Sequence, residues 1–193
     1  MGKRNKPLLD QILVIDVEST CWDGEMSVRP KGEESEIIEI GIALLDHRSG
    51  KISRQDSLLI RPSRSSVSEF CTHLTGWTEK DLSSGISFET ACCHLRQHLS
   101  SKRRVFASWG NYDRRQFERQ CASFNIPYPF GPSHLNVKDL FALRTSLVKH
   151  VNVMAATKIL NIPFEGQWHV GGDDAFNIAR ILAILLRVGP DDG

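Results

Sequence analysis

Four consecutive aliphatic residues, Ile12–Ile15, are followed at once by two acidic side chains, Asp16 and Glu18. An uninterrupted apolar run of this length is typical of a central β-strand that is covered on both faces. Residues two apart on a strand point to the same face, so the two carboxylates converge at one place. Because like charges repel and are costly to desolvate, a bound divalent cation is the simplest way to stabilise them. The run therefore predicts a buried strand that ends in a metal site.

The composition indicates one ordinary globular domain. The chain has 193 residues, of which 40% are hydrophobic and 24% are charged, so it can bury a sizeable core. We expect a domain over residues 10–188, between flexible tails at 1–9 and 189–193. No apolar run is long enough to span a bilayer, and no apolar segment follows the basic first residues. We therefore expect neither membrane insertion nor secretion.

The five cysteines are odd in number and form no C-x-x-C pair: Cys21, Cys71, Cys92, Cys93 and Cys121. This usage predicts reduced thiols in a cytoplasmic protein. A zinc site built from Cys93, His94 and His98 is an alternative, although a solvated helix face explains these residues more simply. Formal net charge is only +1, so the overall balance does not indicate a nucleic-acid binder. Three local basic clusters are interpreted as solvated surface: Lys102–Arg104, Arg114–Arg115, and Arg61 with Arg64.

The order of apolar and turn segments predicts an α/β fold. Strands are expected at 12–17, 37–45 and 51–61, and their order indicates an antiparallel meander. The remaining elements alternate between helix and strand. Helices are expected at 67–74 (closed by Gly76), 87–99 (capped by Ser87), 111–124 (Tyr112 on its apolar side), 139–147, 152–160 and 173–187 (ended by Gly189-Pro190), and strands at 105–108 and 134–137.

Two further acidic positions fall at element ends. Asp113 follows Ser108-Trp109-Gly110, where a strand gives way to a helix, and such edges are where α/β sheets place ligands. Near the C-terminus, His169 lies on a glycine-containing loop that leads to Asp173 and Asp174. We expect Asp173 to cap the last helix and Asp174 to point into the site.

Together, Asp16, Glu18, Asp113 and Asp174 supply four carboxylates with one histidine, His169. All-oxygen ligands favour Mg²⁺ or Mn²⁺ over zinc or copper. Two such ions about 3.5–4 Å apart suit in-line displacement at phosphorus. His169 is then the natural general base for an attacking water. Because neighbouring carboxylates keep the imidazole protonated, activity should rise from mildly acidic towards alkaline pH.

These motifs resemble the DEDDh branch of the DEDD exonuclease superfamily, which includes RNase T and polymerase proofreading subunits. The chain is most similar to the Eri-type RNA exonucleases, with Glu18-Ser-Thr-Cys-Trp22, Glu36-Ile-Ile-Glu39-Ile-Gly, Phe70-Cys-Thr-His-Leu-Thr-Gly76 and Asp173-Asp-x-x-Asn-Ile-Ala179. The resemblance implies a ribonuclease H-like mixed sheet of about five strands flanked by helices. It also implies release of nucleoside 5′-monophosphates from 3′ ends by two metal ions. Asp16 would bridge both ions, Glu18 and Asp174 would complete one, and Asp113 would serve the second.

The resemblance also places the substrate. Ser19 and Thr20 would meet the terminal nucleotide, and Leu74 and Thr75 would pack against its base and sugar. Trp77 departs from the family pattern, which more usually has isoleucine there. All four tryptophans, Trp22, Trp77, Trp109 and Trp168, lie near proposed site residues and could form a stacking platform for single-stranded bases, although core packing is the default for each.

The sequence leaves the substrate open. Single-stranded or short-overhang RNA is favoured, and DNA in repair or proofreading is the nearest alternative. A nuclease-derived binding module without turnover is a second alternative, but such a module is expected to lose an acid or the histidine. The choice between RNA and DNA depends on contact with a 2′-hydroxyl, and therefore on the shape of the pocket.

Overall fold

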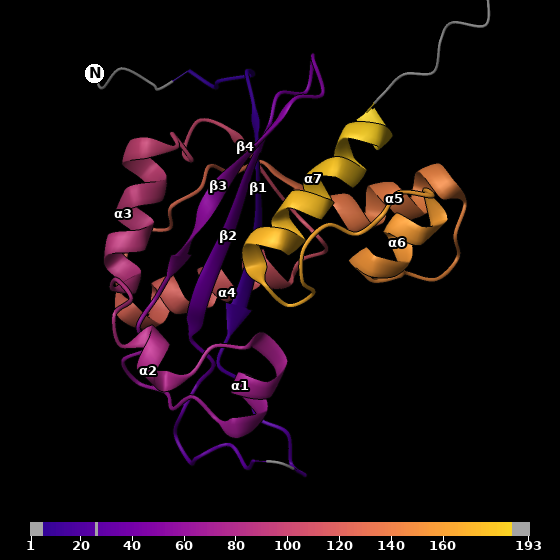
Figure 1. Ribbon diagram of the computed structural model, residues 1–193. Coiled ribbons are helices and arrows are strands. Elements are labelled where there is room, and N and C mark those ends of the chain that lie inside the picture. The colour runs from indigo at the N-terminus through magenta and orange to yellow at the C-terminus, as the bar shows by residue number, and fades with distance from the viewer. Residues whose placement is uncertain (1–5, 26, 187–193) are drawn as a thin grey trace, which may run out of the picture.

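The computed structural model describes residues 6–25 and 27–186. At its centre is a five-stranded mixed sheet in the order β3-β2-β1-β4-β5 (Figure 1). The predicted antiparallel meander comprises β1 (Ile12–Ser19), β2 (Ile37–Leu45) and β3 (Ile52–Leu59). Two shorter strands, β4 (Val105–Ser108) and β5 (His134–Asn136), continue the sheet in parallel with β1. The predicted mixed sheet of about five strands is confirmed.

The central strand β1 has apolar side chains on both faces. Leu13 and Ile15 pack into the cluster formed with α3 (Phe88–His98) and α4 (Tyr112–Phe124). Ile12 and Val14 pack into the opposite cluster, which includes α7 (Gly171–Leu186). Since side chains alternate along a strand, Asp16 and Glu18 continue the second face. The acids therefore leave the sheet on the side covered by α7.

Helices cover both faces of the sheet. Figure 1 shows α7 lying across one face of the sheet, with α5 (Val137–Thr145) and α6 (Val153–Ile159) beside it. Along the chain, two short helices, α1 (Glu69–Thr75) and α2 (Glu79–Leu82), connect β3 to α3. No helix within the described residues is both long and apolar enough to cross a bilayer.

Some details predicted for the helices were wrong. Helix α2 was not predicted, because it is a single turn that is closed by a capping box between Thr78 and Asp81. The fifth helix begins at 137 rather than 139, because the Asn136 side chain accepts the backbone N–H of Asp139 and caps it there. Tyr112 does not lie on the apolar side of α4, since 56% of its surface is exposed.

The last helix begins two residues before its predicted start, at Gly171. This early turn lies directly against β2, where a Cβ on Gly41 would lie 1.9 Å from the backbone carbonyl of Gly171. Two glycines therefore let the strand and helix backbones touch. The expected terminator, Gly189-Pro190, lies outside the described residues.

The expected flexible tails fall only partly within the described residues, because 1–5 and 189–193 lie outside them. The part before β1 contacts the loop that precedes β4. The N–H of Leu8 donates to the carbonyl of Arg103 at 2.8 Å. Asp10 pairs with Arg104 at 2.6 Å, and this guanidinium lowers the pKa of Asp10 to about 2.

Candidate active site at the ends of β1 and α7

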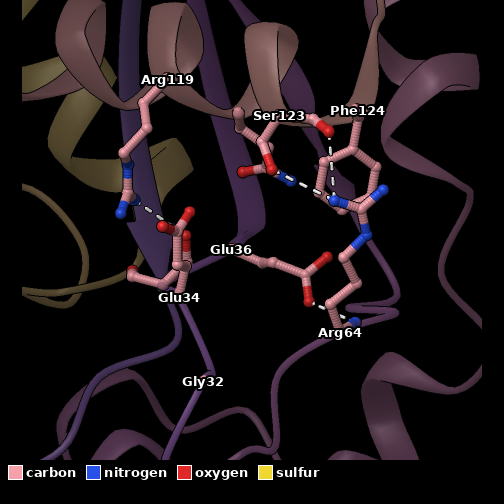
Figure 2. Close-up of a pocket in the computed structure, with 9 residues that line it drawn as sticks. Gly32, Glu34, Glu36, Arg64, Arg119, Ser123 and Phe124 are labelled. Carbon is pink, nitrogen blue, oxygen red and sulfur yellow. Dashed lines mark hydrogen bonds between the residues drawn. The ribbon is translucent and has the colours of Figure 1, made fainter.

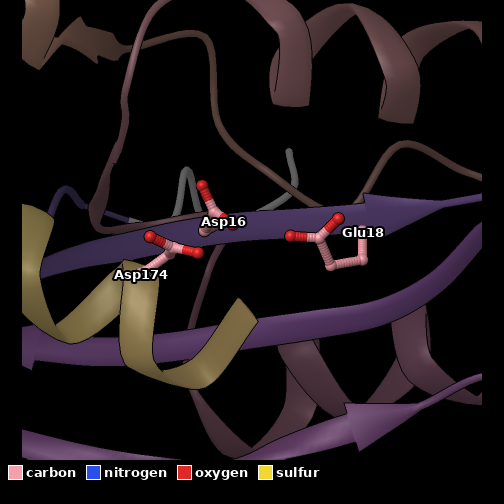
Figure 3. Close-up of side chains that lie close together, drawn as sticks. All are labelled: Asp16, Glu18 and Asp174. Carbon is pink, nitrogen blue, oxygen red and sulfur yellow. The ribbon is translucent and has the colours of Figure 1, made fainter. Parts of the chain in front are cut away.

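Three carboxylates from two elements meet at the end of β1 (Figure 3). One carboxylate oxygen from each of Asp16, Glu18 and Asp174 lies within 4.8 Å of the other two. Glu18 and Asp174 are only 9% and 4% exposed. Strand periodicity brings the first two together, and the first turn of α7 adds the third.

The electrostatics of this cluster favour a bound cation. Burial, followed by the charges of Asp113 and Asp174, raises the pKa of Asp16 well above its ordinary value. Burial likewise raises the pKa of Asp174 to about 7. Among the described residues, Asp174 Oδ1 has no hydrogen-bond partner, although it is buried. An all-oxygen set with uncompensated negative charge fits a hard divalent ion.

Asp113 lies in the first turn of α4, beside this cluster. Its side chain is 3% exposed, and Oδ1 accepts the backbone N–H of Val17 at 3.0 Å. Burial raises its pKa to about 6. Asp113 lines the same cavity as the three acids but does not join their close group. Its role towards a second ion stays a prediction.

His169 lies at the mouth of the cluster on the loop before α7. Its Nδ1 is 3.8 Å from Glu18 Oε1, and its backbone N–H donates to Asp174 Oδ2 at 2.8 Å. The backbone has a φ of 64°, which is uncommon for a residue with a side chain. Trp168 stacks on the imidazole with ring centroids 4.4 Å apart. The Glu18 carboxylate beside the ring raises the pKa of His169.

Asp173 was wrongly predicted to be the helix cap. It is the third residue of α7, because the helix already begins at Gly171. Its carboxylate instead accepts the backbone N–H of Gln167 at 2.7 Å. Asp173 therefore fastens the loop that carries His169, while Asp174 points into the site.

These groups line a cavity of about 330 Å³. Three of the predicted substrate residues line it: Ser19, Leu74 and Trp109. The other three, Thr20, Thr75 and Trp77, do not. The hydroxyl of Thr20 is turned towards Ser65 at 2.9 Å, and the hydroxyl of Thr75 donates to the carbonyl of Cys71 at 2.9 Å.

The tryptophans divide into two groups. Trp109 and Trp168 line the cavity, whereas Trp22 and Trp77 do not, so the four do not form one platform there. Trp109 is 8% exposed and donates its indole N–H to the carbonyl of Val151, as a core residue would. Trp168 is 39% exposed and stacks on His169.

Several residues at or beside the site were not predicted to belong to it: Val17, Cys21, Tyr112, Asn152 and Val153 in the cavity wall, and Glu39 next to it. Glu39 lies opposite Glu18 in the register between β1 and β2. The available signal was an acid inside the apolar run Ile37–Leu45. The wall residues carried no such signal, because long-range packing brings them together.

The other candidate features have structural explanations. All five cysteines are free, and Cys93, His94 and His98 form no metal-compatible group within the described chain. A second cavity, of about 150 Å³, shares no lining residue with the first (Figure 2). Glu36 and the two arginines that line it bond within the protein. Glu36 accepts the N–H of Arg64 at 2.6 Å, and the Arg64 guanidinium lies 3.8 Å from the centre of the Phe124 ring.

Comparison with known proteins agrees with this geometry. The RNase T exonuclease family model matches residues 13–182. The chain is 28% identical to the 3′-5′ exonuclease Snipper of Drosophila melanogaster, over 92% of this chain and 70% of that protein. It is also 28% identical to 3′-5′ exoribonuclease 1 of Rattus norvegicus, over 93% of this chain but only 54% of the relative.

Solved structures give the same result. The nuclease domain of 3′hExo, described as a DEDDh family member bound to rAMP, superposes with a TM-score of 0.81 at 25% identity, covering 93% of both chains. The family model spans most of the chain, and the fold, acids and histidine described above are consistent with it. The chain therefore belongs to the RNase T family of exonucleases, within its DEDDh branch.

Proposed function

We propose that this protein releases nucleoside 5′-monophosphates from the 3′ end of single-stranded or short-overhang RNA, using two Mg²⁺ or Mn²⁺ ions. The observation that carries this proposal is the close group of Asp16, Glu18 and Asp174 with His169 beside it. A binding module without turnover would not need to retain these four groups together with Asp113.

Each residue has a distinct part in the proposed reaction. Asp16 would hold both ions, Glu18 and Asp174 would complete one, and Asp113 would serve the other. When bound, the ions would stabilise charge on the attacking and leaving oxygens. Nδ1 of His169 faces Glu18, which leaves Nε2 to accept the proton of the attacking water. Trp168, stacked on that imidazole, would limit how the ring turns.

RNA is favoured over DNA by the similarities. The rat relative is named an exoribonuclease, and the 3′hExo domain was solved with rAMP, a ribonucleotide. The 330 Å³ cavity accepts a unit of about nucleotide size. The five free thiols support action in a reducing compartment, which we propose to be the cytoplasm.

The proposal is tested with RNA and DNA oligomers labelled at either end, incubated with Mg²⁺ or Mn²⁺. We expect mononucleotides to leave from the 3′ end, faster from RNA. Replacing a ligand that holds both ions should cost about 100-fold or more, so Asp16→Asn should be nearly inactive. Asp139→Asn, an exposed acid on α5, is the matched control and should retain activity. Mononucleotides that appear only from the 5′ end would reverse the polarity assigned to this site.

A further inference from the structure

Glu39 is a fully buried carboxylate to which the proposed reaction gives no role. It is 0% exposed and lies on β2 directly opposite Glu18. Its charge contributes to the raised pKa of both Asp16 and Glu18, so it adds repulsion to a cluster that is already acidic. A buried charge of this kind persists only where specific partners hold it. Its partners therefore indicate what it does.

One oxygen of Glu39 connects two distant segments. Oε2 accepts the indole N–H of Trp77 at 2.8 Å and the backbone N–H of Gly171 at 3.1 Å. The approach of α7 is close, since a Cβ on Gly171 would lie 3.2 Å from Cδ of Glu39. Oε1 has no hydrogen-bond partner within residues 6–25 and 27–186. The strand that faces β1 thus holds both the segment after α1 and the first turn of α7.

Both of these segments carry parts of the site. Gly171 lies two residues after His169 and three before Asp174. Trp77 lies three residues after Leu74, which lines the cavity. The Trp77 ring itself packs against the small cluster of Ile38, Cys71 and Leu82, away from the cavity lining. Its hydrogen bond, rather than its face, is what links it to the site.

We propose that Glu39 is a positioning residue that, through one oxygen, fixes the metal ligand Asp174 and the nucleotide wall at Leu74 relative to β1. Trp77 then holds the segment after α1 against β2, and it is not a surface on which a base stacks. This inference rests on the proposed function. It predicts that the two hydrogen bonds of Glu39 have different effects. Loss of the bond to Trp77 weakens substrate binding, and loss of both bonds also weakens metal binding.

Three substitutions separate these contacts. Trp77→Phe keeps an aromatic ring without the N–H, and loss of one hydrogen bond should raise KM for an RNA oligomer about threefold to tenfold, with kcat and Mn²⁺ affinity unchanged. Glu39→Leu removes the acceptor, and it should raise KM similarly and weaken Mn²⁺ binding about tenfold or more. Glu39→Gln keeps an acceptor oxygen and should retain the wild-type KM. Tyr128→Phe is the matched control, because Tyr128 lines a separate cavity that shares no residue with the site.

The measurements are steady-state kinetics, Mn²⁺ titration by calorimetry and thermal unfolding. If Trp77 stacked on a base, phenylalanine would stack nearly as well, so an unchanged KM in Trp77→Phe overturns this role of Trp77. Lower Tm values with unchanged KM and Mn²⁺ affinity would leave Glu39 a purely structural role and overturn the inference. Should Glu39→Leu fail to fold, Trp77→Phe still decides the link between Glu39 and the nucleotide wall through KM. Mn²⁺ titration of Glu39→Gln then decides the link to the metal, because the retained acceptor oxygen should keep the wild-type affinity. The calorimetry needs no turnover, so an inactive wild type would refute the proposed function and not the link to the metal.

Discussion

At the scale of single residues, His169 controls how the proposed reaction depends on pH. The contact with Glu18 raises the pKa of the imidazole, so it stays protonated to higher pH than an isolated histidine. Only the neutral ring can accept a proton, so kcat/KM should rise as pH rises through this pKa. Bound cations would oppose the effect of Glu18 and shift the rise to lower pH. His169→Gln should lower kcat by about 10²–10⁴-fold and abolish the rise.

The control for this experiment is His47→Gln, an exposed histidine in the turn between β2 and β3. Its pH–rate profile, recorded with saturating Mg²⁺, should match that of the wild type. A wild-type profile that is flat between mildly acidic and alkaline pH would remove His169 from the role of general base.

At the scale of elements, the contact between β2 and α7 determines where Asp174 lies. A methyl group on Gly41 would overlap the carbonyl of Gly171, which is backbone and cannot turn aside as a side chain can. Gly41→Ala should therefore displace the first turn of α7, costing about 1–3 kcal/mol of unfolding free energy. Calorimetry should also show weaker Mn²⁺ binding. Gly24→Ala is the control, because nothing lies within 4 Å of the added methyl group. A destabilised Gly41→Ala that binds Mn²⁺ normally would show that this contact does not set the site.

The elements also show why some boundaries could be predicted and others could not. The strand at 12–17 followed from its own aliphatic residues, and alternation along it predicted that Asp16 and Glu18 share a face. The start of α7 did not follow from its sequence, because Gly171 and Gly172 are poor helix formers. Contact with Gly41 and the bond to Glu39 hold that turn in place. Both depend on residues about 130 positions away, which local patterns do not contain.

For the whole molecule, the acid cluster should couple stability to metal and pH. In the metal-free protein, burial raises the pKa of Asp113 to about 6 and that of Asp174 to about 7, from 3.8. A raised pKa means that the folded state binds more protons than the unfolded chain between these values. The resulting stabilisation is complete below about pH 4 and is lost as pH rises through 6 and 7. Surface acids such as Asp10, whose pKa is lowered, change stability in the opposite direction.

Comparison with Asp174→Asn cancels those surface contributions, because the amide retains an acceptor for the His169 N–H but carries no charge. Without metal, we expect this variant to be more stable than the wild type at pH 8 and to lose most of that advantage by about pH 5. Saturating Mg²⁺ at pH 8 should reduce that advantage, because ligand at 100 times its Kd adds about 2.7 kcal/mol to the protein that binds it and little to the variant. Urea unfolding at both pH values, with and without Mg²⁺, measures each difference. If the free-energy difference between the two proteins is the same at pH 5 and pH 8 and insensitive to Mg²⁺, then Asp174 is not part of a cation site.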